Sequence, residues 1–310
     1  MGNNYLLSTV LKRRTLFIIT FLFLFVFSLS SSHGNEKEFN KSLQTDSNGV
    51  KIHFIDVGEG EAIFLETLQG ENALIDTGNI ISGYKLVNYL KEINVTSLDY
   101  LILTHMHPDH IGGSFFVAQM LDIKNIYDNG ENISKDAVSG DLYDTLYHWY
   151  NQLIRKSTKW KSLKAGDSLT IGNVNISVLW PSRPFPFPGS NPSSLVLMGQ
   201  LNNFKTLLSA DVPTYVEAEL LKKGYDLKAN VLKVGHHGNN DATSEEYIEA
   251  ISPEVSIICI NKDNVRGYPS DEVVDRLRRH NSDIYRTYQD GTIVINVSDN
   301  GDYTVTTEKK

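Results

Sequence analysis

The sequence is almost without cysteine. Only one thiol occurs among the 310 residues, Cys259, and it lies in the apolar stretch VSIICI. A chain with a single thiol cannot build a disulfide framework. Because its neighbours are apolar, we predict that Cys259 is a small core residue rather than a ligand or a nucleophile.

Positive charge is also scarce. The chain has 29 Lys and Arg against 37 Asp and Glu, a formal net charge of −8, and without residues 1–33, which hold three basic and no acidic residues, the balance is −11. Strong non-specific binding of nucleic acid depends on clustered Lys and Arg. The composition therefore argues mildly against such binding but allows a small or neutral substrate. With 41% apolar and 21% charged residues the chain can fold around a real core.

Long apolar runs are missing except near the N-terminus. A basic group at 12–14 precedes sixteen uncharged residues at 15–30, a pattern typical of secretory signals. The run is shorter than the roughly 20 residues of a usual membrane span. We expect a signal peptide or a retained N-terminal membrane anchor at 1–33, followed by a polar linker at 34–49. The rest of the chain would then be secreted, or anchored on the outer face of the membrane through this segment alone.

From residue 50 onward short β-type runs alternate with helical ones, without a linker-like break before residue 298. We predict an α+β fold of two packed mixed sheets with helices outside each, a four-layer αββα sandwich forming one domain at 50–310. Residues 284–298 are expected to form a hairpin that turns at Asp290-Gly291. The other expected strands are 50–58, 62–68, 72–78, 100–105, 168–180, 193–202, 204–212, 229–234 and 253–261. The expected helices are 83–93, 111–121, 140–157, 214–224, 244–252 and 270–280.

Metal-binding or acid–base residues follow several of the apolar strands. The segment THMHPDH at 104–110 holds three histidines and an aspartate, and other strands run into Asp76, Asp211 and the histidine pair at 236–237. A solvated loop would instead carry a mixture of Ser, Asn, Lys and Glu. Since strand ends collect the ligands in such architectures, we predict that these side chains converge.

Imidazole and carboxylate suit zinc, manganese or iron, and one carboxylate can bridge two ions. His105 and His107, as a His-x-His pair, would send both imidazoles towards one ion, while Asp109 and His110 are placed for a second. Two ions roughly 3.5–4 Å apart can hold a hydroxide and clamp the oxygens of a phosphoryl or carbonyl group. The sequence predicts a centre for two divalent ions, zinc or manganese.

These motifs resemble the metallo-β-lactamase superfamily, whose signature is H-x-H-x-D-H after an apolar strand and a later strand-ending Asp. FIDVGEGEAIFLE, ALIDTG, LTHMHPDHIGG, LLSADV, LKVGHHGN and YRTYQDGTIVI further resemble the hydrolase domain of ComEC-type competence membrane proteins. The resemblance covers about residues 50–298. The multi-span channel region of that family is missing here, so we expect a free-standing, exported ComEC-like hydrolase.

The resemblance implies a role for each ligand candidate. His105 and His107 would hold the first ion, and Asp109 and His110 the second. Asp211 would bridge the two. With the histidine pair, Asp109 also counts among the residues that the resemblance implies for catalysis.

Five further positions carry implications of the same kind. Asp76 resembles a strand-ending Asp that braces the histidine turn, and at least one of His236 and His237 would be a ligand or a proton donor. Asn191 lies near where many members have a third His for the first ion. Tyr268 stands where the family usually has a His of the second ion, so that ion would be weak, different in kind, or held with help from the histidine pair. Tyr268 itself would face a phosphate or metal-bound water, or be a loop aromatic.

The leading functional hypothesis is a metal-dependent hydrolase of phosphodiesters outside the cell, with nucleic acid as a candidate substrate and no protein partner inferable. A metal-bound hydroxide would attack phosphorus, and His236 or His237 would protonate the departing alkoxide. One alternative is hydrolysis of another ester or amide, such as a phosphocholine ester, a lactone or a β-lactam. The other is a catalytically impaired binding module, which Asn191 and Tyr268 would favour.

Overall fold

The computed structural model describes residues 49–131 and 141–309. The chain divides into two compact units, residues 1–38 and 39–310, and the first lies outside the described residues. The expected signal or anchor at 1–33 and nearly all of the linker at 34–49 therefore stay predictions. In the described part of the chain, no helix combines the length and the apolar character needed to cross a membrane.

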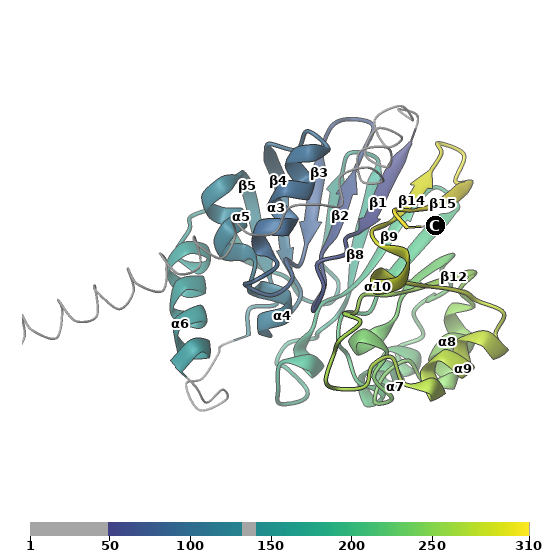
Figure 1. The fold of residues 1–310 in the computed structure, drawn as a ribbon. Coiled ribbons are helices and arrows are strands. Elements are labelled where there is room, and N and C mark those ends of the chain that lie inside the picture. The colour runs from purple at the N-terminus through teal and green to yellow at the C-terminus, as the bar shows by residue number, and fades with distance from the viewer. Residues whose placement is uncertain (1–48, 132–140, 310) are drawn as a thin grey trace, which may run out of the picture. The chain divides into compact units, whose positions relative to one another are not determined.

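Two mixed sheets make up the middle of the second unit (Figure 1). The first contains, in spatial order and among the described residues, β15 (Tyr303–Thr307), β14 (Ile293–Val297), β1 (Val50–Phe54), β2 (Ile63–Glu66), β3 (Asn72–Ile75), β4 (Ser97–Leu103), β5 (Asp122–Asp128) and β6 (Trp160–Ser162). The second contains β13 (Asp283–Arg286), β12 (Val255–Ile258), β11 (Val231–Lys233), β10 (Phe204–Leu208), β9 (Val196–Leu201), β8 (Val174–Trp180) and β7 (Ser168–Ile171). In each sheet one half is parallel, β3 to β6 and β10 to β13, and the other is antiparallel.

Helices cover the outer faces of both sheets (Figure 1). On the first sheet lie α3 (Gly83–Glu92), α5 (Ser114–Met120) and α6 (Asp141–Tyr150), which continues as a π-helical turn (Asn151–Arg155). On the second lie α7 (Thr214–Lys222), α8 (Glu245–Ile251) and α9 (Asp271–Arg279). The remaining helical turns within residues 49–131 and 141–309 are α4 (Pro108–Ile111), α10 (Thr287–Asp290) and two 3₁₀ turns (Asn191–Ser193 and Gly235–Gly238).

Three apolar clusters separate these layers. Ala73 and Ile75 of β3 point into the cluster between the sheets, while Leu74 points to the cluster under α3. This division follows from the two-residue period of a strand. A third cluster joins the second sheet to α7, α8 and α9. The four-layer αββα sandwich expected from the sequence is therefore confirmed.

The helix α9 shows how local chemistry fixes such an outer element. The Ser270 side chain accepts a hydrogen bond from the Val273 amide, and Asp271 and Glu272 place negative charge in the first turn. Val273 and Leu277 are buried four residues apart, so one face packs on the second sheet. The cap and the apolar stripe together set where the helix begins and which way it faces.

The expected hairpin at 284–298 is wrong. β13 pairs in parallel with β12 in the second sheet, whereas β14 pairs with β1 and β15 in the first. The short helix α10 and Gly291, with a φ of 70°, carry the chain from one sheet to the other. Period-two alternation shows which side of a strand is buried, but it does not name the partner strand.

His53 on β1 is fully buried and lies 2.8 Å through Nδ1 from the Tyr89 hydroxyl. Its Nε2 is 3.8 Å from a Glu66 carboxylate oxygen. Burial, with help from the nearby Lys51 charge, lowers the pKa of His53 from 6.5 to about 3. The buried imidazole is therefore neutral throughout the physiological range.

This burial predicts acid sensitivity. Between pH 6.5 and 3 the unfolded chain binds a proton at His53 that the folded chain does not, so stability falls as the pH drops through 6.5, by about 3 kcal/mol at pH 4. Denaturant unfolding of the metal-free protein and of His53→Gln at pH 7 and pH 4 measures this loss. Between pH 7 and pH 4 the variant should lose about 3 kcal/mol less folding stability than the wild type. Glu66, whose pKa burial raises, titrates in both proteins, so equal losses would show that His53 is not responsible.

Candidate metal centre

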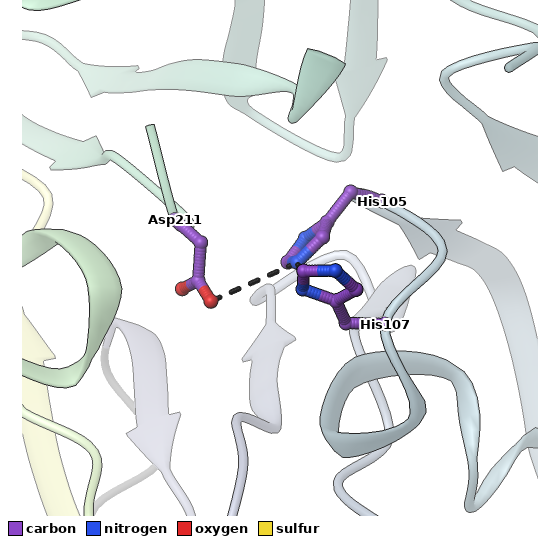
Figure 2. Close-up of side chains that lie close together, drawn as sticks. All are labelled: His105, His107 and Asp211. Carbon is purple, nitrogen blue, oxygen red and sulfur yellow. Dashed lines mark hydrogen bonds and ion pairs between the residues drawn. The ribbon is translucent and has the colours of Figure 1, made fainter. Parts of the chain in front are cut away.

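The centre lies at one edge of the two packed sheets. Asp76 directly follows β3, and THMHPDH at 104–110 follows β4. Asp211 comes after β10, and the histidine pair at 236–237 follows β11. Because β3 and β4 are parallel, as are β10 and β11, their carboxyl ends meet at the same edge of each sheet. Figure 2 shows His105 and His107 on one side and Asp211 approaching from the other.

The histidine turn is tightly constrained by backbone contacts. His107 is extended and is followed by Pro108, which opens the single helical turn of α4. The Thr77 amide donates to the His110 carbonyl at 2.7 Å. A side chain at Gly113 would put its Cβ 2.1 Å from the Thr77 carbonyl oxygen, so only glycine fits this close approach.

The first group of donors is formed by His105, His107 and Asp211, whose ligand atoms all lie within 4.8 Å of one another. His105 Nε2 is 3.2 Å from His107 Nδ1 and 3.7 Å from Asp211 Oδ2. His105 and Asp211 are buried, and His107 is half-buried. These are the donors expected for the first ion.

The second group is formed by Asp109, His110 and His237. His237 Nε2 lies 3.3 Å from His110 Nε2 and 3.6 Å from Asp109 Oδ2. Asp211 Oδ2 is also close to this group, at 3.2 Å from His110 Nε2 and 3.5 Å from His237 Nε2. A single carboxylate oxygen therefore lies against both groups, which is the position of a bridging ligand.

The ring orientations suit metal binding. Asp76 accepts hydrogen bonds from the Thr104 amide and hydroxyl at 2.7 and 2.6 Å and lies 2.6 Å from His110 Nδ1, so His110 Nε2 faces the centre. His237 Nδ1 donates to the Cys259 carbonyl at 2.7 Å, which likewise leaves Nε2 for the centre. Such partners fix the tautomer and the direction of a ligating histidine.

The electrostatics show what the donor set can hold. Burial lowers the pKa of His105 and of His107, so both imidazoles are neutral and keep a lone pair for a metal. Burial alone would lower the pKa of His110, but Asp211 and Asp76 raise it well above its ordinary value. Against the cost of burial, His110 and His237 hold the pKa of Asp211 well below its usual range. Buried carboxylates and neutral imidazoles in these positions fit divalent cations of the zinc and manganese type.

Backbone strain gathers at the same edge. Asp76, Ala210, His236 and His237 have φ angles of 57°, 45°, 45° and 54°, in the left-handed region that residues other than glycine rarely adopt. Each such residue costs on the order of 1–3 kcal/mol. Strain of this kind clusters at functional sites, because the surrounding structure must hold side chains where chemistry needs them.

Three candidates lie together beside the two donor groups rather than within them. His236 Nδ1 is 2.7 Å from Asp241 Oδ1, and His236 Nε2 is 3.2 Å from Asn191 Nδ2. The ring of Tyr268 meets the His236 ring edge-on at 5.8 Å. The structure thus brings His237, and neither His236 nor Tyr268, to Asp109 and His110.

Sequence reasoning missed two charged residues next to the centre. Glu61 and Lys233 form an ion pair, and both side chains are fully buried. The signal was Lys233 inside the apolar run VLKV and Glu61 directly before the apolar residues AIF. Charged residues are almost never fully buried unless they are paired.

The chain is similar to known proteins of one superfamily. The family model of the metallo-β-lactamase superfamily matches residues 55–133. The chain is 32% identical over 260 residues to ComE operon protein 3 of Bacillus subtilis, covering 78% of this chain and 32% of the relative. It is 27% identical over 248 residues to competence protein ComA of Neisseria gonorrhoeae, covering 79% and 32%. The chain thus spans about a third of the length of these relatives.

The solved structure of CmlA, a diiron β-hydroxylase from Streptomyces venezuelae, matches with a TM-score of 0.53 and 13% identity over 81% of this chain and 54% of that one. At this identity the likeness shows the fold alone. The fold, the family model and the two relatives are all consistent with a metal site built from the donor groups at the strand ends. The chain belongs to the metallo-β-lactamase superfamily of metal-dependent hydrolases and, within it, to the ComEC-like proteins.

Proposed function

We propose that the protein hydrolyses phosphodiesters with two divalent ions. The observation that carries this proposal is the convergence of two three-residue donor groups on one oxygen of Asp211. His105 and His107 would hold one ion, and Asp109, His110 and His237 the other. Bound ions of this kind lower the pKa of a water molecule and neutralise charge on phosphoryl oxygens.

Formal charge supports a singly charged substrate. The buried acids at the centre are Glu61, Asp76, Asp109 and Asp211, and Lys233 is the buried base. Four negative charges and one positive charge leave −3, and the exposed Arg266, 3.5 Å from an Asp109 oxygen, adds one positive charge. Two divalent ions therefore make the centre positive, whereas a single divalent ion leaves it neutral. A centre loaded with two ions therefore attracts a phosphodiester, which carries one negative charge.

We assign the two histidines of the pair different roles. His237 Nε2 lies among the donors of the second group, whereas His236 lies beside them with Nδ1 held by Asp241. The Asp241 contact raises the pKa of His236 against the opposing effect of burial, which favours a protonated ring. His236 is thus the candidate that gives a proton to the leaving alkoxide.

Two alanine variants separate these roles. His237→Ala should lower the bound metal from about two ions per chain to about one. His236→Ala should keep both ions but lower turnover of an alkyl phosphodiester at least about 10²-fold. The loss should be under tenfold for a nitrophenyl ester, whose leaving group needs no proton. Elemental analysis and turnover of both substrates measure this, and equal metal loss in the two variants would contradict the assignment.

The substrate class is tested on the purified protein loaded with zinc or manganese. We expect hydrolysis of bis(p-nitrophenyl) phosphate and of single-stranded DNA, and no consumption of nitrocefin or of a lactone. One of the two relatives is named a competence protein, and we take this as support for nucleic acid as the phosphodiester. If both phosphodiesters stay intact while metal is bound, the proposal is wrong.

We also propose that the hydrolase acts outside the cell. The basic group at 12–14 and the uncharged run at 15–30 support export. N-terminal sequencing of the protein from the culture medium and from membranes tests this. A mature N-terminus near residue 34 would indicate a cleaved signal, and an intact N-terminus in the membrane fraction a retained anchor. Intact protein in the cytosol would contradict export.

A further inference from the structure

The buried ion pair of Glu61 and Lys233 connects the two sheets directly beneath the metal centre. Lys233 is the last residue of β11 in the second sheet, and Glu61 precedes β2 of the first. Neither side chain is exposed to solvent. The ion pair therefore joins one sheet to the other through two buried charges.

The backbone around the pair ties it to both halves of the centre. The Glu61 amide donates to the Asp109 carbonyl at 3.1 Å, and the Glu61 carbonyl accepts from the Gly78 amide at 2.7 Å. Lys233 Nζ donates to the carbonyl of Ala210 at 3.1 Å, immediately before Asp211. One partner is therefore fixed to the histidine turn, and the other to the strained turn that presents Asp211.

The two oxygens of Asp211 lie in different surroundings. Oδ2 faces the imidazoles of His105, His110 and His237 at 3.2–3.7 Å. Oδ1 faces Lys233 Nζ at 3.7 Å, and among the described residues it has no hydrogen-bond partner. The ammonium group thus lies behind the carboxylate, on the side away from the donor groups.

We propose that Glu61 and Lys233 are positioning residues that hold Asp211 with Oδ2 turned towards both ions and fix the spacing between the two halves of the centre. This inference rests on the ligand assignment proposed above. It gives Glu61 and Lys233 no contact with substrate. Their effect reaches the reaction through the geometry of the bridging carboxylate.

Stability alone does not explain why the pair is kept. Burying two charges is expensive, and replacing a buried ion pair by apolar residues of similar volume is often neutral or stabilising. Burial would lower the pKa of Lys233, but Glu61 and Asp211 raise it above its ordinary value, so the ammonium stays charged. A pair that costs this much and lies against the bridging ligand is best explained by the arrangement it imposes.

The test is the double variant Glu61→Gln with Lys233→Met, which removes both charges together and leaves neither one unpaired. Manganese is titrated into the metal-free full chain, and stoichiometry, affinity and the electron paramagnetic resonance spectrum are recorded. We expect near-native circular dichroism, ten- to a hundredfold weaker manganese binding, and loss of the exchange-coupled two-ion signal. Two ions at wild-type affinity with an unchanged signal would overturn the proposal.

A second variant separates the effect of side-chain position from the effect of charge. It also tests the positioning role if the double variant does not fold. Glu61→Asp keeps both charges but shortens one side chain by a methylene, so we expect weaker binding and an altered coupling signal. Wild-type manganese binding and an unchanged coupling signal in Glu61→Asp would show that the pair acts through charge alone and would contradict the positioning role. His53→Gln, a buried change away from the centre, is the matched control and should bind two ions normally. If the wild type itself binds fewer than two ions, the ligand assignment fails instead.

Discussion

Asp211→Asn should lower phosphodiester turnover at least about 10³-fold and reduce the bound metal from about two ions per chain to one or none. Asp211 Oδ2 lies within 3.7 Å of His105, His110 and His237, so one change weakens both groups. An amide is isosteric with the carboxylate but neutral, and its oxygen is a poor bridge between two cations. A thousandfold loss corresponds to about 4 kcal/mol of transition-state stabilisation, within the several kcal/mol that metal ions supply.

The same chemical change elsewhere is the control. Asp99 accepts a hydrogen bond from the Asn72 amide and pairs with Lys124, far from the donor groups. Asp99→Asn should therefore keep both ions and full turnover. Elemental analysis and hydrolysis of a nitrophenyl phosphodiester are compared for the two variants. Full metal content together with full activity in Asp211→Asn would show that Asp211 bridges nothing.

Removing the metal should destabilise the fold by about 8 kcal/mol. An ion present at a thousand times its Kd stabilises the folded state by about 4 kcal/mol, and two sites are expected. In a domain of this size each kcal/mol shifts Tm by about 2–4 °C, so chelation should lower Tm by roughly 15–30 °C. The physical reason is the buried negative charge of Asp76, Asp109, Asp211 and Glu61, which Lys233 and a protonated His110 balance only in part once the ions are removed.

Scanning calorimetry with and without a chelator measures this shift. Zinc and manganese should restore the higher Tm, whereas calcium, which prefers six to eight oxygen ligands, should not. In Asp211→Asn the shift should shrink to half or less. An unchanged Tm on chelation of a protein shown to contain two ions would contradict the expectation that the bound ions stabilise the fold.

The sequence predicts the architecture well where strands are central and apolar. YLIL and NALI became β4 and β3, and the residues that follow them meet at one edge. It misses three strands of the first sheet. The segments DIKNIYD, WKS and YTVTT form β5, β6 and β15, and none was expected. β6 and β15 are the edge strands and have no fully buried residue, while in β5, which lies between β4 and β6, the apolar residues do not alternate with polar ones.

The candidate site shows a similar limit. Residue types at strand ends indicate that donors gather, because that follows from the parallel halves of the sheets. The residue types do not indicate which imidazole ring faces the metal centre. His236 and His237 are neighbours with positive φ, and only the backbone conformation and the Cys259 carbonyl orient His237 towards Asp109. The Glu61 and Lys233 pair depends on contact between the two sheets, which no local pattern reveals.

The donors come from segments that are far apart in the sequence. His110 approaches Asp211 across 101 positions of sequence and His237 across 127. Closing loops of this length costs entropy that only the finished fold repays. A nascent or truncated chain would contain only some of the donor residues and would bind cations weakly. Tight metal binding therefore requires that the segments carrying His110, Asp211 and His237 have already folded against one another.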